Sequence, residues 1–594
     1  MRRLLLVLSA AALAWGGLVL ATGGIEWKVA GILFRSRAPD RALLIGLGLL
    51  AVQAIAFRDA FARDSARIAA SVRPGLAALA VACAIALAAH AAYFGSFTAG
   101  GSDAFGYVSQ AYSWASGSLP RAQPFPISVP WPSADVSLAP LGYRPGPQPH
   151  TMVPTYAPGL PLMMAASLVV GACGPYLVVP FCAALAVWLT FALGRRAGGP
   201  WVGTLAALFV ATSPIVLFQS LWPMSDVPAA ALWTGAAVAA LRDQRRHAAL
   251  CGLWTAAGLL VRPNLPIVPV VFFVHMLLSS RGRERWMRVA LFSLPVAAAV
   301  GAIAALYTAW YGAPWKSGYG AAEEIFSLSN VLPNLTRYPV WLWKSQSPLI
   351  LLAVLPLLPP FNRDGSRRAV RLCAALFLAT LASYLVYAPF EEWWYLRFLL
   401  PAIPSLMVLL ALGIVFAARR FSATWARIGV MAATILIVTM TARFSSAVAP
   451  PAPLREGERR YVDVGVYVNQ ALPRNGVVLG VQESGSVRHY GGRMTIRWDL
   501  IDRDWAPRAP AELERLGLHP YLVIEDFELP QFRGWFGVAA DAPLPWPLIA
   551  RMRENGGVSV YDLGSRASAV APVSIEPGGT PRCAAPPPLL VQRP

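Results

Sequence analysis

One carboxylate in this sequence lies where a membrane segment ends, a place where an acid is costly to keep. Asp103 belongs to the stretch Gly-Gly-Ser-Asp-Ala-Phe-Gly-Tyr at 100–107, eight residues after the apolar run 75–95. A carboxylate at the mouth of a membrane helix needs a reason. Asp103 either caps a helix or stays solvated in a loop, or it is a catalytic base that faces a membrane-embedded substrate.

The elements that would position Asp103 are apolar helices. Of the 594 residues, 56% are hydrophobic and 13% are charged, whereas soluble domains carry about 25% charged residues. Several apolar stretches approach or exceed the roughly 20 residues that cross a bilayer as a helix. The fold class is therefore predicted to be a polytopic α-helical membrane protein. Its apolar segments lie near 4–23, 42–57, 75–95, 158–174, 176–193, 199–218, 226–241, 247–261, 265–280, 288–311, 347–360, 369–389, 397–417 and 425–447.

The arginines between these segments predict how the chain is oriented. Short Arg-rich loops lie on the cytoplasmic side of a membrane, and the loops here share one side only if segment 158–174 does not cross. We interpret this segment, which begins Pro-Gly-Leu-Pro, as an interfacial or re-entrant helix on the outer face. We therefore predict about 13 transmembrane helices, a cytoplasmic N-terminus and an outer C-terminus. One loop, with Lys28, Arg35, Arg37 and Arg41, falls outside and disagrees with this orientation.

Charge and cysteine content exclude two other classes of protein. The net charge of +20 comes mostly from Arg in short loops, so we assign it to orientation and to contact with membrane lipids. The chain has no Lys/Arg-rich block with interleaved aromatics, and no nucleic-acid partner is expected. The six cysteines show neither a Cys-x-x-Cys motif nor a Cys/His metal spacing, and we predict no disulfide.

Composition divides the chain into three parts. Residues 1–74 hold two N-terminal membrane helices and a cytoplasmic loop, and 75–447 form the main membrane domain with outer loops 96–156 and 311–347. In the first outer loop, 105–116 is predicted to be a short amphipathic helix with its aromatic residues toward lipid. Residues 448–594 are predicted to be a Pro-rich linker and a small α/β domain outside the cytoplasm. Its β-rich runs lie at 477–481, 521–525 and 558–561, and its helical stretches at 462–472 and 511–516.

This orientation places acids and bases together on the outer face of the membrane, at helix ends or in outer loops. Such a gathering on one face is typical of a site. The residues concerned are Asp103, Asp226, Arg262, Lys316, Glu323, Glu324, Glu391, Glu392 and Arg397.

Four stretches, in this order, resemble motifs of the GT-C glycosyltransferases, which take sugars from polyprenyl-phosphate donors and include protein O-mannosyltransferases and aminoarabinose transferases. The first is the Asp103 stretch, and the second is Tyr-Ala-Pro-Gly-Leu-Pro-Leu at 156–162. The third is Pro-Met-Ser-Asp-Val-Pro at 223–228, and the fourth is Leu-Arg-Phe-Leu-Leu-Pro at 396–401. The resemblance covers about 75–420. It differs at Ala104, where many relatives carry a second acid, and at Ala157, where they carry a first proline.

The resemblance implies an inverting sugar transfer to an extracytoplasmic lipid, glycan or protein acceptor. Asp103 would be the general base, and Arg397, Lys316 and Arg262 would stabilise the leaving phosphate. Asp226 would orient the acceptor or would hold a divalent metal, a role that Asp103 could share. The residues themselves leave a second interpretation of Asp226 open, since Asp followed by Val-Pro at 227–228 also suits the N-cap of a helix. Tyr107, Tyr156 and Glu392 complete the predicted substrate-binding set. The stretch 484–493 either contacts the acceptor or forms a turn.

Two other functions stay open at this stage. A transporter or flippase for a lipid-linked glycan would show paired repeats and polar residues at mid-membrane, and neither is visible in the sequence. A non-catalytic envelope assembly protein would keep the fold without the chemistry, which fits the missing second acid. The high Ala, Arg and Pro content indicates a GC-rich bacterial genome. The predicted location is therefore the bacterial inner membrane, with the C-terminal domain periplasmic or extracellular.

Overall fold

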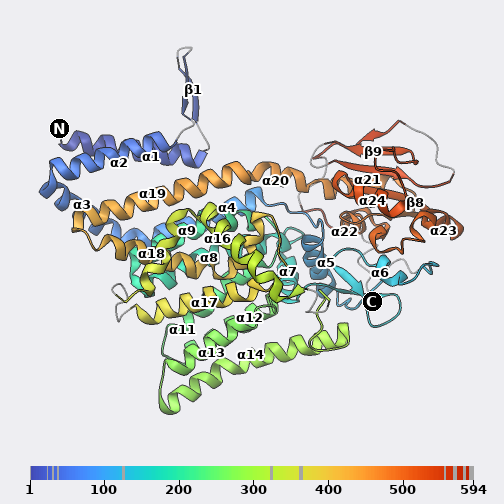
Figure 1. The fold of residues 1–594 in the computed structure, drawn as a ribbon, viewed down its shortest axis with the longest axis horizontal. Coiled ribbons are helices and arrows are strands. Elements are labelled where there is room, and N and C mark those ends of the chain that lie inside the picture. The colour runs from blue at the N-terminus through green and yellow to red at the C-terminus, as the bar shows by residue number, and fades with distance from the viewer. Residues whose placement is uncertain are drawn as a thin grey trace.

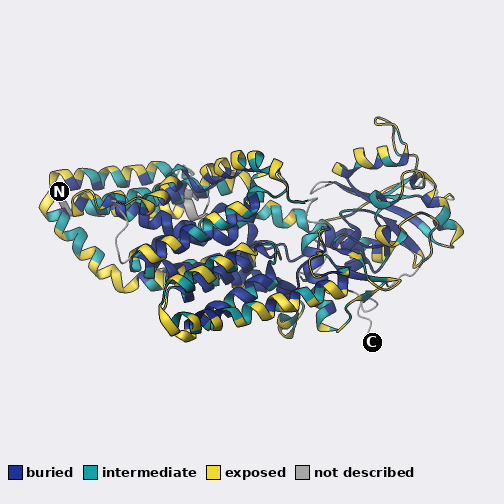
Figure 2. Ribbon diagram, turned by 60° about the horizontal axis from the view of Figure 1, so that its bottom comes forward, coloured by how far each residue is buried: buried dark blue, intermediate teal, exposed yellow. Residues whose placement is uncertain are grey.

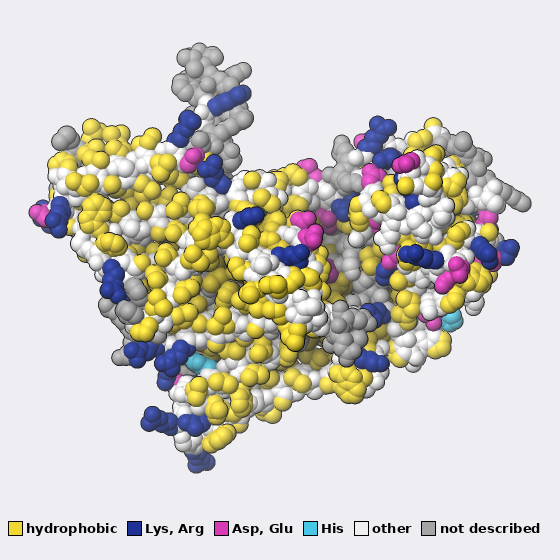
Figure 3. Space-filling view, in the orientation of Figure 1, with side chains coloured by type: hydrophobic (Ala, Val, Ile, Leu, Met, Phe, Trp, Pro, Cys, Tyr) yellow, Lys and Arg dark blue, Asp and Glu magenta, His cyan; other side chains and the backbone are white. Residues whose placement is uncertain are grey.

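The computed structural model joins a long helical body to a smaller domain built on a β-sheet (Figure 1). It describes residues 2–22, 25–29, 32–36, 39–123, 127–320, 325–359, 366–553, 557–565, 571–578 and 583–586. Glu323 and Glu324, which the sequence placed on the outer face, lie outside these residues. On the face shown in Figure 3, hydrophobic side chains cover most of the helical body, and Lys and Arg side chains gather toward its end away from the sheet domain.

The helical body is that of a multi-pass membrane protein. Among the described residues, seven helices are long and apolar enough to cross a membrane, and an eighth is counted if two helices bent by 108° form one span. The seven are Pro39–Ala56, Arg58–Phe94, Gly174–Gly198, Gly282–Tyr311, Arg367–Leu385, Trp393–Ala418 and Ala423–Ala471, and the bent pair is Leu328–Gln346 with Pro348–Leu357. The number of 13 spans stays a prediction.

Several predicted segments are shorter or more broken than their hydropathy suggests. Segment 199–218 is divided into α9 (Pro200–Ala211) and α10 (Pro214–Gln219), because Pro214 has no N–H to donate to a continuous helix. Helix α7 (Gly159–Ser167) has nine residues, which rise about 14 Å against a hydrocarbon core of about 30 Å. Helix α7 is thus too short to cross alone, as expected of an interfacial segment.

The remaining helices of the body follow in chain order. Residues 58–74, predicted to be a loop, are mostly helical, and α1 and α2 are joined by a hairpin of β1 (Ile25–Val29) and β2 (Ile32–Ser36). The helices are α1 (Arg2–Thr22), α2 (Pro39–Ala56), α3 (Arg58–Val72), α4 (Leu76–Phe94), α8 (Gly174–Gly198), α11 (Asp226–Ala240), α12 (Arg245–Val261), α13 (Ile267–Leu278), α14 (Gly282–Tyr311), α16 (Val331–Gln346), η4 (Pro348–Leu357), α17 (Arg367–Leu385), η5 (Trp393–Ala402), α18 (Ile403–Ala418) and α19 (Ala423–Val448).

The first outer loop, 96–156, has a structure of its own. It contains α5 (Asp103–Ala115), α6 (Ala134–Leu138) and a small antiparallel sheet of β3 (Arg121–Ala122), β5 (Thr151–Pro154) and β4 (Tyr143–Pro145). The predicted helix at 105–116 is present, but the prediction that its aromatic residues face lipid was wrong. Phe105 and Tyr107 are 2% and 5% exposed, because Gly485 of the sheet domain packs against Phe105 and Tyr156 of the same loop packs against Tyr107. Buried residues of this kind are dark blue in Figure 2.

The C-terminal part folds around a six-stranded sheet of order β11-β9-β10-β8-β6-β7. Strands β7, β6 and β8 are parallel, whereas β8, β10 and β9 pair antiparallel. The three predicted β-rich runs coincide with β6 (Gly476–Leu479), β8 (His519–Glu525) and β10 (Val558–Asp562). The other elements are β7 (Met494–Ile496), β9 (Leu548–Met552), β11 (Val573–Ser574), α20 (Pro451–Glu458), α21 (Arg460–Ala471), α22 (Ser484–Ser486), α23 (Ala509–Arg515) and α24 (Leu529–Phe536).

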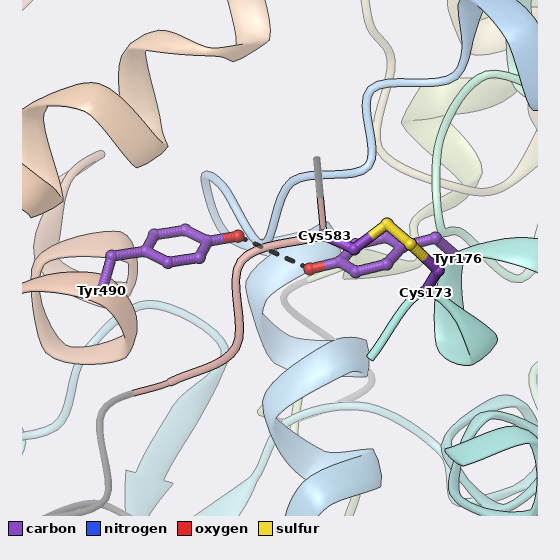
Figure 4. Close-up of a disulfide and its surroundings, with 4 residues drawn as sticks. All are labelled: Cys173, Tyr176, Tyr490 and Cys583. Atoms are coloured by element: carbon purple, nitrogen blue, oxygen red, sulfur yellow. Dashed lines mark hydrogen bonds between the residues drawn. A yellow bond between two sulfur atoms is a disulfide. The ribbon is translucent and has the colours of Figure 1, made fainter. Parts of the chain in front are cut away.

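A disulfide joins the C-terminal tail to the helical body, and the prediction of no disulfide was therefore wrong. Cys173, at the start of α8, is bonded to Cys583, 410 residues away in sequence (Figure 4). The tail folds back over the turn between α7 and α8, which brings the two Cα atoms within 5.1 Å. Spacing rules could not reveal this pair, because they detect cysteines that are close in sequence.

Candidate active site

Asp103 is the first residue of helix α5 and lies at the junction of the helical body and the outer loop. The partial positive charge of a helix N-terminus favours a carboxylate there. The Tyr156 hydroxyl donates to Asp103 Oδ1 over 2.6 Å, and Arg397 Nη1 donates to Asp103 Oδ2 over 3.0 Å. The Asp103 side chain keeps 32% of its surface exposed. It is therefore held at both oxygens and still accessible.

Tyr156 follows strand β5 and fixes one side of the carboxylate. Its hydroxyl lies 2.6 Å from Ser102 Oγ as well as from Asp103, and its ring centroid is 4.6 Å from that of Tyr107. Burial, together with the negative charge of Asp103, raises the pKa of Tyr156 above its ordinary value. The phenol thus stays protonated and remains a hydrogen-bond donor to Asp103.

Arg397, on η5, fixes the other side of Asp103 and has donors to spare. Its guanidinium lies 5.6 Å from the ring centroid of Tyr395 and 5.4 Å from that of Phe398, distances at which a cation is attracted to an aromatic face. Its Nε is buried and has no hydrogen-bond partner among the described residues. A planar guanidinium with unused N–H groups suits an anionic ligand such as a phosphate.

A second acid–arginine pair lies deeper in the body. Asp226, the first residue of α11, is 2.5 Å from Arg262 Nη1, and the two side chains are 3% and 9% exposed. Arg262 lies 5.9 Å from the ring centroid of Phe398, the same ring that faces Arg397. A further link runs from α5 to the start of α11, because the Tyr107 hydroxyl donates to Ser225 Oγ over 3.0 Å.

The structure does not bring every predicted residue to this place. Lys316 is exposed, and no described carboxylate pairs with it, although its loop touches the site through Gly318 against Thr155 and through Tyr319, 5.9 Å from Tyr156. Glu392 is exposed before η5, and its described contact is a backbone carbonyl that accepts from Tyr395 N–H. Asp103, Tyr107, Tyr156, Arg397, Asp226 and Arg262 form the connected set.

The donors in this set do not fit a divalent metal. Both oxygens of Asp103 are used by Tyr156 and Arg397, and Asp226 is used by Arg262. Within the described ranges, no group of three or more His, Cys, Asp and Glu side chains is placed to hold a metal ion. A cation at either acid would meet an arginine instead of further oxygen ligands.

Sequence reasoning missed two residues that connect the pairs. The Phe398 ring centroid lies 5.9 Å from the Arg262 guanidinium and 5.4 Å from that of Arg397, and Ser225 accepts the hydrogen bond from Tyr107. Both lie inside motifs that were already recognised, at the positions next to Arg397 and Asp226. Phe398 and Ser225 contact residues that are distant in sequence, so only their position beside Arg397 and Asp226 could have pointed to them.

Comparison with solved structures identifies the architecture. The structure of ArnT from Cupriavidus metallidurans bound to undecaprenyl phosphate superposes with a TM-score of 0.50 at 12% identity, over 84% of this chain and 99% of ArnT. The chain has the GT-C fold. The sequence itself matches no protein-family model and no curated protein.

Two other GT-C structures are more distant. The oligosaccharyltransferase AglB from Archaeoglobus fulgidus superposes with a TM-score of 0.43 at 12% identity, over 82% of this chain and 74% of AglB. The mycobacterial arabinofuranosyltransferase AftD gives a TM-score of 0.43 at 15% identity, over 78% of this chain and 41% of AftD.

Proposed function

We propose that this protein is a membrane glycosyltransferase that moves a sugar from a polyprenyl-phosphate donor to an acceptor on the outer face of the bacterial inner membrane. The observation that carries the proposal is the Asp103 carboxylate, held by Tyr156 and Arg397 and still partly exposed. The GT-C fold supports the same reaction class, since the similar ArnT structure was solved with undecaprenyl phosphate bound. A fold alone does not choose the acceptor.

Asp103 acts as the general base of an inverting displacement. The acceptor's hydroxyl or amine attacks the anomeric carbon, and its proton passes to the Asp103 carboxylate. The bond between the anomeric carbon and the phosphate oxygen breaks, and the oxygen keeps the electron pair. The proton on Asp103 then leaves to solvent or to the released phosphate, so no covalent enzyme intermediate forms. Tyr156 keeps the carboxylate oriented during this transfer.

Arg397 takes up the negative charge that develops on the leaving phosphate. Its Nη1 contacts Asp103, and 20% of its side-chain surface stays exposed, which supports a role in which one guanidinium contacts both the base and the leaving group. Fixed cationic donors aimed at developing charge are among the strongest contributions to catalysis. We assign Lys316, which is exposed on the neighbouring loop, to contact the donor headgroup.

The buried pair of Asp226 and Arg262 serves a different purpose in this scheme. Only 3% of the Asp226 side chain and 9% of the Arg262 side chain are exposed, so neither group is free to contact a substrate. Arg262 shares the Phe398 ring with Arg397, and Ser225 beside Asp226 is bonded to Tyr107. The pair therefore positions η5 and α5 relative to one another.

A sugar-transfer assay on membranes tests the proposal. Radiolabelled polyprenyl-phosphate mannose and other prenyl-phosphate sugars are offered to wild type and to Asp103→Asn at equal expression. We expect wild type to move label and Asp103→Asn to lose about 10²–10⁴-fold in rate, the contribution typical of a general base. Asp135→Asn is the matched control, since Asp135 is an exposed acid of the same outer loop.

The possible results separate the alternatives. Full transfer by Asp103→Asn would move the base to another residue. An absence of transfer from every donor by wild type would reject the glycosyltransferase and leave the flippase and the assembly protein as explanations.

A further inference from the structure

The stretch 484–493 lies against the segment that carries Asp103. The sequence left open whether this stretch contacts an acceptor or only forms a turn. In the structure it comprises α22 and the π-helix η6 (Val487–Gly491), and Ser484 to Gly491 are all buried. Arg488 is fully engaged by Thr495, by the Gln123 side chain and by the Leu138 carbonyl. A stretch this enclosed does not receive an acceptor.

Tyr490 makes the first contact with the Asp103 segment. Its hydroxyl accepts a 2.7 Å hydrogen bond from the backbone N–H of Ala99, inside the protein and 391 residues away in sequence. The same hydroxyl is 3.5 Å from that of Tyr176 on α8 (Figure 4). Ala99 precedes a turn in which the Gly100 carbonyl accepts from Phe105 N–H. Tyr490 therefore fixes the start of the turn that contains Asp103.

Two close approaches complete the contact. The Tyr461 ring on α21 covers Gly100 so tightly that a Cβ there would lie 2.0 Å from Tyr461 Cδ2. On the other side of Asp103, a Cβ at Gly485 would lie 2.3 Å from Phe105 Cδ1. A side chain at either glycine has no room. The sheet domain thus holds the segment 99–105 at three points around Asp103.

The tail fastens this arrangement to the helical body. The Cys173–Cys583 disulfide lies beside Tyr176, which approaches Tyr490 (Figure 4). Because Cys173 belongs to the helical body and Cys583 to the tail of the sheet domain, the bond connects the two parts next to the three contacts.

We propose that the sheet domain is a positioning element for catalysis, in which Tyr490 and Tyr461 hold the 99–105 segment so that Asp103 stays in line with Tyr156 and Arg397. This inference rests on the proposed function for its catalytic part. Its geometric part, the holding of 99–105, stands on the contacts alone. A small displacement of a catalytic group lowers the reaction rate by a large factor. Contacts that fix the position of 99–105 are therefore expected to affect the rate of transfer.

The test combines kinetics with hydrogen exchange on the full-length protein in detergent. Tyr490→Phe removes only the hydroxyl, and Gly100→Ala pushes against the Tyr461 ring. Tyr467→Phe and Gly457→Ala are the matched controls: the Tyr467 hydroxyl bonds to none of the described residues, and a Cβ at Gly457 meets nothing within 4 Å. Exchange is followed by mass spectrometry in peptides that cover 96–105.

We expect Tyr490→Phe to lower kcat about fivefold, the equivalent of one hydrogen bond, with KM for the donor unchanged. The rate of hydrogen exchange in 96–105 should rise about tenfold or more in Tyr490→Phe. Gly100→Ala should change kcat and exchange at least as much. Both control variants should match wild type in kcat and in exchange. Wild-type kcat or wild-type exchange in Tyr490→Phe would overturn the inference. A smaller folded fraction with unchanged kcat per folded molecule would overturn it too, because the contacts would then only stabilise the fold.

Failure of the proposed function gives a different pattern. Wild type would then transfer no label from any donor, whereas the exchange measurement would still decide whether the sheet domain holds 99–105.

Discussion

Two acid–arginine pairs of similar chemistry lie in one protein at very different depths. In both, the aspartate is the first residue of a helix, Asp103 of α5 and Asp226 of α11. The Asp103–Arg397 pair keeps 32% and 20% of its side-chain surface exposed, whereas the Asp226–Arg262 pair keeps 3% and 9%. The more exposed pair, Asp103–Arg397, is the one whose side chains can leave each other to contact a substrate.

This difference in exposure indicates a catalytic role for the Asp103–Arg397 pair and a structural role for the Asp226–Arg262 pair. Removing a buried charge from its partner leaves an uncompensated charge in a poorly solvated place, which makes the pair hard to open. The Asp103–Arg397 pair is partly solvated, which weakens it relative to a buried pair, so a substrate phosphate can compete for the arginine. The Phe398 ring lies within cation–π distance of both guanidinium groups and so connects the two pairs.

After the loss of Asp103, the loss of the Arg397 side chain should cause the largest decrease in the rate of transfer. Arg397→Ala is expected to lower kcat about 10²–10³-fold, because the leaving phosphate loses its cationic donor, with little change in thermal stability. The measurement is single-turnover transfer in detergent. Arg397→Lys should keep only part of the wild-type rate, since an ammonium group lacks the paired, coplanar N–H donors of a guanidinium. Arg337→Ala, which removes an arginine paired with exposed Glu391, should leave the rate unchanged, and an equal loss there would contradict the assignment.

Opening the buried pair should instead cost stability. Asp226→Asn is expected to lower the free energy of unfolding by about 3–5 kcal/mol, because Arg262 would be left buried without its counter-charge. Denaturant titration in detergent measures this loss. Glu284→Gln opens an exposed pair with Arg245 and should cost under about 1 kcal/mol. A stable Asp226→Asn protein with no transfer would reverse the comparison and make Asp226 a reacting group.

Of the two changes at the Asp103 contacts, the smaller loss of rate should come from removing the Tyr156 hydrogen bond that orients the base. Tyr156→Phe is expected to lower kcat about tenfold, which corresponds to one hydrogen bond to a charged group. Steady-state kinetics with saturating donor measures it. Tyr319→Phe, which changes a phenol whose ring touches Tyr156 without bonding Asp103, is the control. A rate in Tyr156→Phe equal to wild type would show that Arg397 alone orients Asp103.

The parts of this structure that depend on neighbours in sequence could be predicted. The helix predicted at 105–116 is present as α5, the β-rich runs are strands, and the four motifs indicated the GT-C fold. The partners could not be predicted, since Asp103 meets Arg397 across 294 residues and Ala99 meets Tyr490 across 391. For the same reason Arg262, a candidate phosphate ligand by sequence, was not foreseen as the partner of Asp226.

Composition also misjudged which faces are covered. The aromatic side chains of α5 were assigned to lipid because membrane interfaces are rich in Tyr and Trp. Phe105 instead packs against Gly485 of the sheet domain. A hydropathy pattern reports that a face is apolar, and it does not say whether lipid or another part of the chain covers it.

The bond between Cys173 and Cys583 also constrains when and where the protein matures. Cys583 follows the described strands of the sheet domain in the sequence, so the bond can close only after that domain has been synthesised. Disulfides persist in oxidising compartments and not in the cytosol. Thiol trapping of newly made chains would therefore report both the completion of folding and the side of the membrane on which the sheet domain lies, independently of any arginine count.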